Sequence, residues 1–507
     1  MRTSLASRQE TVRRLLILIG LYAIPAIALM SPIIDADIWW HLRTGQWIVE
    51  HGAIPTTDPF SSYGMGKPWT AYSWLFEVLV YGLYSALGLT GILLYRVVLS
   101  FAVLAAVHRL VTKREPRFVI ATNIVLLAVL GILPLLNVRP WLFTILFFTL
   151  TLDAVLDLRE GTNTKVVWLL PPMFALWANL HIQFIYGLFL LSLATAESMI
   201  EGLLRRAAVE NDARTIPSGR LLIVTALCAA ATLATPYHLH LYQTILELIR
   251  QTGQFQYVTE LLALSFRSPW SWFVLAATLG AAFSLGWRRE VRPFPLLLLA
   301  AGAFLSFRAS RDVWFVVIAA AALIATFRSP KAIADRFALT KRRVLLVAAG
   351  VVAVLVVVGR IRNISERHLE SALAEKYPVA AAAVVEERAY PGPLYNHFNW
   401  GGYLIWRLPN LPVAMDGRGP GNLHDDERIK RSIATWGGNR SWASDPELAA
   451  ARLVIAQVEY ALVSLLRLDP RFELVYEDDI AAIFVARPHP PEEQHAQSHT
   501  RSVTQHR

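Results

Sequence analysis

The sequence predicts a polytopic α-helical membrane protein of about eleven transmembrane helices, followed by a small C-terminal α/β soluble domain. Three observations support this fold class: 55% of the 507 residues are hydrophobic, the mean hydropathy is +0.42, and the apolar residues come in long runs. A soluble chain of this length would be more polar, and runs of about 20 apolar residues are typical of membrane-spanning helices. The single cysteine, Cys228, excludes an intrachain disulfide and a cysteine metal cluster.

Eleven apolar runs are long enough to cross a bilayer. The first run, Leu15 to Ile34, follows a basic N-terminus and could be a signal peptide. It lacks a small-residue cleavage site, however, and many more apolar runs follow it, so we interpret it as the first transmembrane helix. The predicted spans cover residues 14–34, 90–110, 118–136, 140–157, 165–180, 184–203, 219–236, 270–286, 292–308, 312–327 and 343–360.

The lysines and arginines between the runs indicate the orientation. They lie in alternate loops, near Lys113, Arg159, Arg205, Arg288 and Arg328, on the same side as the basic N-terminus. By the positive-inside rule this side is the cytoplasm, so the formal charge of +10 reflects topology rather than nucleic-acid binding. We expect a multi-pass protein of the inner (plasma) membrane with a cytoplasmic N-terminus and an extracytoplasmic C-terminal domain.

The apolar stretch from Tyr72 to Leu87 is short and is interrupted by Glu77. If it crossed the membrane, the loop at Lys113 and every later basic loop would break the positive-inside rule. The stretch is therefore predicted to be a helix that lies at the outer interface. On this interpretation residues 1–360 form the transmembrane domain, with long outer loops at 35–89 and 237–269.

The composition changes after Arg360, and residues 361–487 are predicted to form a small extracytoplasmic α/β domain. A helix is expected at Glu366 to Glu387. The final segment, residues 488–507, is polar without an apolar period and is predicted to be disordered. Strands are expected at residues 393–395, 413–415, 460–463, 472–476 and 480–486, the last two forming a hairpin.

Charged side chains at membrane depth are costly, so they suggest function. Asp35 and Asp37 directly follow the first predicted span, and His41 lies one helical turn beyond Asp37. If the spans pack as one bundle, these and the other polar groups at the outer ends could line one outward-facing cavity. The other groups are Arg139, Asn179, His181, His238, His240, Glu260, Arg267, Arg308, Arg311 and Asp312.

This set of residues suits sugar transfer from a lipid phosphate. An acceptor hydroxyl is a weak nucleophile, so a carboxylate must take its proton. The leaving group is an anionic phosphate, which guanidinium groups or a metal ion can neutralise. Asp35, Asp37 and His41 could also bind a divalent metal ion, although their spacing alone is not specific for one.

Structural interpretations of the same residues stay open. Asp35 or Asp37 could cap the helix that follows, which is as compatible with the sequence as catalysis. A single arginine such as Arg139 more often reaches to lipid headgroups, and Arg311 could pair only with Asp312. The tryptophans of the first outer loop are typical of an interfacial belt.

Several stretches resemble a known family. Residues 35–48, 52–61 and 69–77 resemble the first outer loop of bacterial multi-spanning proteins of the GT-C glycosyltransferase superfamily. Residues 396–407 and 415–418 resemble the C-terminal domain of the same largely uncharacterised group. The resemblance in architecture covers most of the chain, whereas its specific motifs occupy only these stretches.

The resemblance implies a polyprenyl-phosphate-linked donor and catalysis on the outer membrane face. It also implies an acidic residue in the first outer loop that acts as a base or helps to bind a metal ion, a role that falls on Asp35 or Asp37, with Asp37 favoured slightly. An interfacial helix after that loop is a further trait, which residues 72–87 fit. The chain has no acceptor-recognition motif such as the one that marks oligosaccharyltransferases.

The leading hypothesis is an inverting glycosyltransferase in which Asp37, assisted by Asp35, activates an acceptor hydroxyl of a cell-envelope glycan or lipid. Arg139, Arg308 and Arg311 would hold the donor phosphate. Further substrate contacts are expected from His41, His181, His238 and Glu260.

Two other hypotheses remain. The first is a non-catalytic carrier-lipid binder or envelope-assembly factor, whose C-terminal domain would dock a partner through Tyr395 to Tyr403. The second is a transporter, which ranks last because the polar residues gather at one membrane face rather than at the midplane.

Overall fold

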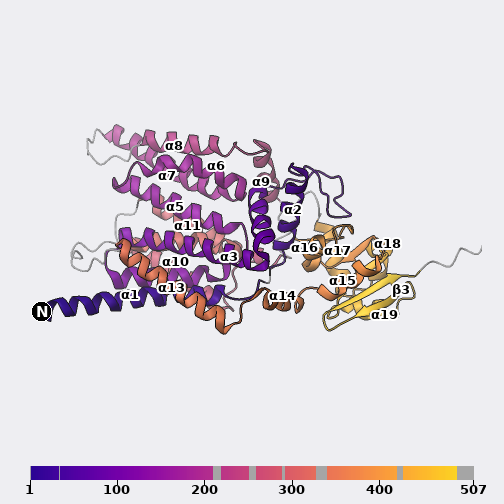
Figure 1. Ribbon diagram of the computed structural model, residues 1–507. Coiled ribbons are helices and arrows are strands. Elements are labelled where there is room, and N and C mark those ends of the chain that lie inside the picture. Colours follow the sequence, from indigo (N-terminus) through magenta and orange to yellow (C-terminus); the bar gives the residue numbers. More distant parts are fainter. Residues whose placement is uncertain are drawn as a thin grey trace, which may run out of the picture.

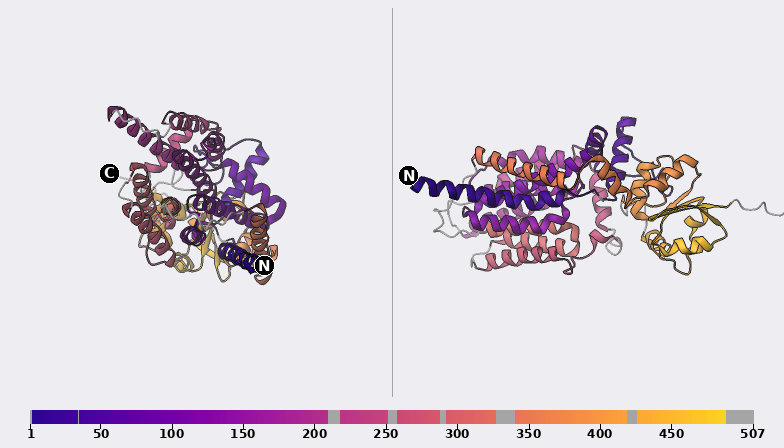
Figure 2. Two further views of the ribbon diagram at one scale, coloured as in Figure 1. Left: turned by 90° about the vertical axis from the view of Figure 1, so that its left-hand side faces the viewer. Right: turned by 60° about the horizontal axis from the view of Figure 1, so that its bottom comes forward.

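The computed structural model describes residues 2–33, 35–208, 218–250, 258–287, 292–326, 340–418 and 426–487. A bundle of helices carries a separate α/β domain at one end, and the N-terminus of α1 lies at the opposite end (Figure 1). Two further views show the same arrangement (Figure 2). The segment predicted to be disordered, 488–507, lies outside the described residues.

A helix lies at each of the eleven predicted spans. Within the described residues, seven helices are long and apolar enough to cross a membrane, and three apolar helices, Val166–Leu180, Ser218–Ala231 and Pro293–Arg308, are shorter. These helices confirm a polytopic α-helical membrane protein, while the number of eleven spans stays a prediction. The helices are α1 (Arg2–Leu29), α3 (Trp74–Arg114), α4 (Phe118–Ile132), α5 (Trp141–Glu160), α6 (Leu170–Leu180), α7 (Phe184–Ala208), α8 (Ser218–Ala231), α10 (Pro269–Trp287), α11 (Pro293–Arg308), α12 (Val313–Ala325) and α13 (Lys341–Ile361).

Helix α3 is broken at Gly88, whose backbone is not helical (φ 63°, ψ −148°). The part before the break covers most of the stretch that the sequence places at the outer interface. This part and α2 (Ile38–His51) lie across the end of the bundle that faces the α/β domain (Figure 1). The two helices pack closely at Gly45, where a Cβ atom would lie only 2.1 Å from the carbonyl oxygen of Glu77. The arrangement agrees with an interfacial helix before Gly88 and a span after it.

The break leaves backbone N–H groups at the start of the second part of α3 without helical partners, and Glu366 accepts their hydrogen bonds. Its carboxylate binds the N–H groups of Leu89 (2.6 Å) and Thr90 (3.0 Å) and the hydroxyl of Thr90 (2.9 Å). Glu366 begins α14 (Glu366–Ala374), the first helix after the bundle. Glu366, which lies 277 positions after Leu89, therefore caps the start of the second part of α3. This cap fixes the C-terminal segment to the bundle.

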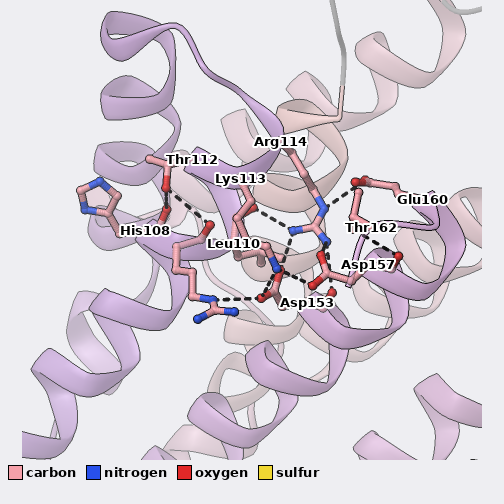
Figure 3. Close-up of polar contacts among 10 residues, drawn as sticks. His108, Leu110, Thr112, Lys113, Arg114, Asp153, Asp157, Glu160 and Thr162 are labelled. Carbon is pink, nitrogen blue, oxygen red and sulfur yellow. Dashed lines mark hydrogen bonds and ion pairs between the residues drawn. The ribbon is translucent and has the colours of Figure 1, made fainter. Parts of the chain in front are cut away.

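At its other end, α3 is held to α5 by a buried ion network (Figure 3). The fully buried guanidinium of Arg114 pairs with Asp153 (2.7 Å) and Asp157 (3.2 Å). Lys113 pairs with the same two carboxylates at 3.0 and 2.5 Å. These two basic residues, which the sequence analysis used for topology, therefore also join two helices through charges that would be costly to leave unpaired.

The α/β domain contains a four-stranded sheet in the order β1-β2-β4-β3. Strands β1 and β2 are parallel and the other neighbours are antiparallel. The strands are β1 (Leu394–Asn396), β2 (Leu453–Gln457), β3 (Phe472–Glu477) and β4 (Ala481–Ala486). Helices α15 (Val379–Arg388), α16 (Phe398–Arg407), α17 (Asp426–Trp436), α18 (Pro446–Ala450) and α19 (Ala461–Leu468) complete the domain. The sheet confirms a small α/β unit near the C-terminus, and the predicted hairpin forms β3 and β4.

Two predicted elements of this domain are wrong in type. The strand expected at residues 460–463 is the start of α19, in which Leu462, Val463 and Leu466 are buried at a helical spacing. The strand expected at residues 413–415 does not join the sheet, and Val413 forms a single bridge with Ser61 of the first outer loop.

Two further differences concern boundaries and one missed strand. The single helix expected at 366–387 is divided into α14 and α15 with Pro378 between them, because proline cannot continue the backbone hydrogen bonding of a helix interior. Strand β2 was not predicted, since its first four residues are all buried and show no polar alternation.

The cap on α3 can be tested by replacing Glu366 with alanine. We expect Glu366→Ala to lower the stability of the full-length protein by about 1–2 kcal/mol, because two backbone N–H groups and a hydroxyl lose a charged acceptor. Thermal unfolding in detergent would measure the effect, with Glu370→Ala, an exposed glutamate on the same helix, as the control. Equal unfolding temperatures for both variants would contradict a capping role.

Candidate functional site

Asp35, Asp37 and Arg139 meet at the end of the bundle that faces the α/β domain. The Nε atom of Arg139 donates to Asp35 Oδ2 at 2.7 Å, and its Nη1 atom pairs with Asp37 Oδ2. Arg139 lies just before α5 and Asp37 just before α2, so the starts of two helices bring together residues about a hundred positions apart. The side chains of Arg139 and Asp37 are each 16% exposed and that of Asp35 is 7% exposed, so the group is only partly buried.

The aspartates do not have the same role. Asp37 occupies the N-cap position of α2, but its side chain makes no capping hydrogen bond. Asp35 Oδ1 accepts the backbone N–H of Asp37 at 2.9 Å, which forms a local turn. The capping interpretation is therefore contradicted for Asp37, whose carboxylate is directed to Arg139 instead.

Glu260 extends this group to Arg311. Its Oε2 atom lies 3.8 Å from Arg139 Nη2, and its Oε1 atom lies 3.7 Å from Arg311 Nη1. The loops that carry Glu260 and Arg311 are joined by a backbone hydrogen bond from Ser310 to Leu262. Glu260 and Arg311 are 31% and 33% exposed, so a solute can reach them. We call the five residues Asp35, Asp37, Arg139, Glu260 and Arg311 the acid–arginine cluster.

The three histidines proposed as substrate contacts, His41, His181 and His238, contact other groups of this chain. His41 pairs with Glu77 (Nδ1 to Oε1, 3.2 Å), both being buried, and burial lowers the pKa of His41 well below its usual value. His181 contacts the hydroxyl of Thr144 at 2.8 Å. The exposed His238 contacts the carbonyl oxygen of Leu233 at 2.9 Å.

Arg308 and Arg311 flank the turn between α11 and α12. Arg308 is the last residue of α11, and Arg311 belongs to the short 3₁₀ turn Ser310–Asp312 that follows. Asp312 in this turn accepts a hydrogen bond from Tyr186 (3.0 Å) and one from Gln183 (3.4 Å). Arg311 therefore lies close to a carboxylate outside its own turn, that of Glu260. The sequence alone had left open that Arg311 pairs only with Asp312.

The set considered for a metal ion, Asp35, Asp37 and His41, is not brought together. Arg139 holds both aspartates, and His41 is paired with Glu77. Among the residues that the structure describes, no group of three or more His, Cys, Asp and Glu side chains is arranged to hold a metal ion.

A second buried ionic group joins the first outer loop to the α/β domain. Arg418 binds Asp58 through Nη1 (2.5 Å) and Nη2 (3.1 Å), and it binds Asp416 through Nε (2.9 Å) and Nη2 (2.8 Å). All three side chains are fully buried. The rings of Phe60 and Trp69 lie 5.2 and 4.9 Å from the guanidinium carbon. We call Asp58, Asp416 and Arg418 the Arg418 clasp.

No role for the clasp was predicted from the sequence, although its residues lie in two of the stretches that carry the family resemblance, 52–61 and 415–418. Asp58 and Arg418 are separated by 360 positions, and neither lies in an apolar run that would have marked it as buried. The one available hint was the presence of charged residues in both stretches, Asp58 in the first and Asp416 and Arg418 in the second.

Residues 395–403, considered above as a partner-docking segment, are used inside the chain. Tyr395, Trp400 and Tyr403 are buried, and the Tyr403 ring packs edge-on against Trp39 of α2 at 5.3 Å. Gly402 lies in α16, where a Cβ atom would lie 2.5 Å from the carbonyl oxygen of Ala36. Gly402 is therefore needed for close helix packing, and the buried aromatic side chains of this segment pack within the chain.

Comparisons with known proteins agree on the architecture. No protein-family model and no curated protein matches the sequence. The archaeal oligosaccharyltransferase AglB from Archaeoglobus fulgidus, in complex with an inhibitory peptide and a dolichol-phosphate, aligns with a TM-score of 0.52 at 13% identity, over 88% of this chain and 69% of that chain. The oligosaccharyltransferase of the same organism in the apo form aligns with a TM-score of 0.50 at 12% identity, over 88% and 70%.

ArnT from Cupriavidus metallidurans, bound to undecaprenyl phosphate, gives a TM-score of 0.46 at 12% identity, over 94% of this chain and 99% of that chain. At these identities the likeness concerns the fold, and the fold argument rests on the two oligosaccharyltransferase structures. The fold implied by the family resemblance is thereby confirmed. In its architecture, this chain is a multi-spanning membrane protein with a fold similar to that of these oligosaccharyltransferases.

Proposed function

We propose that the protein is an inverting glycosyltransferase that moves a sugar from a polyprenyl-phosphate-linked donor to a glycan or lipid acceptor of the cell envelope. The observation that carries the proposal is the acid–arginine cluster, in which three carboxylates and two guanidinium groups alternate at one end of the bundle. Sugar transfer needs both kinds of group close together, a carboxylate for the acceptor proton and cations for the leaving phosphate. The AglB structure of the same fold holds a dolichol-phosphate, which supports this class of donor.

Asp37 is the proposed base. Asp35 already accepts hydrogen bonds from the backbone of Asp37 and from Arg139, and it is the less exposed of the two. In the reaction the Asp37 carboxylate takes the proton of the acceptor hydroxyl while the acceptor oxygen attacks the anomeric carbon. The bond between that carbon and the phosphate oxygen breaks, and the polyprenyl phosphate leaves with the bonding electron pair. Asp35 assists by holding Arg139 and the backbone of Asp37.

Arg311 and Arg139 are the proposed phosphate ligands. Arg311 is one-third exposed and its Nη1 atom lies 3.7 Å from Glu260 Oε1, which is longer than a hydrogen bond, so Arg311 can bind a ligand without breaking a tight pair with Glu260. Arg308 lies on the same turn and adds positive charge. Guanidinium groups bind phosphate oxygens through paired hydrogen bonds, which suits a leaving group that gains charge.

We further propose that this end of the bundle faces the outer side of the inner membrane. Lys113 and Arg114 lie at the other end of α3, in line with the positive-inside rule. The test is a fusion, after Arg360, to a reporter that works only in the cytosol. Activity of this reporter would contradict the proposed orientation.

A second candidate function is carrier-lipid binding without transfer. The observation that favours it is the pairing of Arg139 with both aspartates, because the carboxylate proposed to take the proton is already bound to a guanidinium group. Lipid binding would then need the arginines but not Asp37. The two predictions below separate these functions.

Asp37→Asn and Asp35→Asn should have unequal effects on transfer. We expect Asp37→Asn to reduce the transfer rate by roughly 100-fold or more, because an amide cannot take the acceptor proton, and Asp35→Asn to reduce it less. The assay compares envelope glycans of cells that carry each full-length variant, with Asp479→Asn, an exposed aspartate of the β3–β4 turn, as the control. Unchanged glycans in a folded Asp37→Asn protein would leave lipid binding as the better proposal.

Arg311→Gln should weaken binding of the lipid phosphate. A hydrogen bond to a charged group contributes about 1.5–3 kcal/mol, so we expect roughly a tenfold or larger increase in Kd for undecaprenyl phosphate. Native mass spectrometry or fluorescence titration of the full-length protein in detergent would measure the Kd. Arg388→Gln, at an exposed position of the α/β domain, is the control, and an equal Kd for both variants would remove Arg311 from the phosphate site.

A further inference from the structure

The α/β domain touches the proposed base itself. A Cβ atom built at Gly417 would lie 2.2 Å from Asp37 Oδ1 and 3.2 Å from its carboxyl carbon. The next atom, Nε1 of Trp40, would be 3.7 Å away, which is an ordinary contact. The backbone of Gly417 therefore lies directly against the Asp37 carboxylate, on the side of Oδ1, while Arg139 binds Oδ2.

The position of Gly417 is fixed by its neighbours on both sides. Arg418 and Asp416 belong to the Arg418 clasp, which is fully buried and tied to Asp58 of the first outer loop. The strand-like segment just before them also pairs with that loop, since Val413 N–H donates to the Phe60 carbonyl oxygen at 3.1 Å and Ser62 N–H donates to the Val413 carbonyl oxygen at 2.9 Å. The segment can move relative to the loop only if these contacts break.

Helix α16 adds a third support behind the same segment. A Cβ atom at Gly401 would lie 1.9 Å from the carbonyl oxygen of Met415, and one at Gly402 would lie 2.5 Å from that of Ala36. These neighbouring glycines let α16 pack between the segment that leads to Gly417 and the segment that leads to Asp37. Ala36 precedes Asp37 directly, so the domain contacts both the backbone and the side chain at this point.

We propose that the α/β domain is a positioning element of the acid–arginine cluster, and that Gly417, held by the Arg418 clasp, sets the place of the Asp37 carboxylate. Gly417 and Arg418 are positioning residues rather than catalytic ones, because they act through Asp37. The catalytic part of this inference rests on the proposed function, whereas the contact itself does not.

The first test measures the contact without any activity. Gly417→Ala should lower the unfolding temperature of the full-length protein in detergent, because the new methyl group and the Asp37 carboxylate cannot both keep their places. In an Asp37→Ala background the same substitution should lower it much less, since the two atoms closest to the methyl group, Oδ1 and the carboxyl carbon of Asp37, are then absent and Trp40 Nε1 lies at an ordinary contact distance of 3.7 Å. Gly82→Ala is the control, because a Cβ atom there has no neighbour within 4 Å.

The second test measures the consequence for function. Because a misplacement of about 1 Å can cost on the order of 100-fold in rate, we expect Gly417→Ala to reduce kcat by roughly tenfold to 100-fold. The Kd for undecaprenyl phosphate should stay within about threefold of wild type, since Arg311 is not displaced. A purely structural role would instead lower kcat and lipid binding together with the amount of folded protein.

If the Gly417→Ala protein does not fold, the Arg418→Lys variant tests the same positioning role. It keeps the charge of the clasp and does not change residue 417 itself. An ammonium group cannot bind two carboxylates through the same fork of donors, so the substitution should loosen the hold on Gly417. We expect reduced kcat with lipid-phosphate binding retained.

Equal destabilisation by Gly417→Ala in the wild-type and Asp37→Ala backgrounds would overturn the proposed contact. Unchanged kcat in folded Gly417→Ala or Arg418→Lys protein would overturn the positioning role. If the wild-type protein shows neither transfer nor lipid binding, the proposed function fails, and the unfolding experiment alone still decides whether Gly417 sets the place of Asp37.

Discussion

Two carboxylates two residues apart can share a partly buried site only when a cation neutralises them, and Arg139 has this role for Asp35 and Asp37. The pairing ties the start of α5 to the segment between α1 and α2. Through Glu260, the same arginine is connected to Arg311 and to the turn before α12. The ends of several helices are therefore ordered around one guanidinium group, and its loss would leave like charges facing each other at low solvent exposure.

The Arg418 clasp solves a different problem, which is how a soluble domain keeps a fixed place on a membrane bundle. Inter-domain contacts within a chain are commonly modest and allow motion. Here a fully buried arginine, Arg418, binds one carboxylate of the α/β domain, Asp416, and one of the first outer loop, Asp58. Separation of the domain from the loop would break the ion pair between Arg418 and Asp58. The cap of Glu366 on Leu89 and Thr90 adds a second, independent attachment at the membrane end of the domain. Together they make the domain and the first outer loop one structural unit.

Much of the architecture could be predicted because a membrane-spanning helix forms all its backbone hydrogen bonds within one segment. Each span is therefore visible in the sequence as a continuous apolar run. The same logic predicted that Asp35, Asp37 and Arg139 share a membrane depth. It could not predict which charges touch, because depth fixes only one coordinate. The partners His41–Glu77 and Asp58–Arg418 depend on helix packing and on a contact over 360 positions, which no local pattern records.

On the proposed function, Asp37 and the donor phosphate compete for the guanidinium group of Arg139. At rest Arg139 binds Oδ2 of Asp37, the carboxylate that is proposed to take the acceptor proton. On the proposed function, an arriving donor phosphate offers the same guanidinium a second anion, so any hydrogen bond that Arg139 gives to the phosphate is withdrawn from Asp37. Gly417 becomes important at that moment, because a carboxylate that loses its cation keeps its place only through the backbone packed against Oδ1.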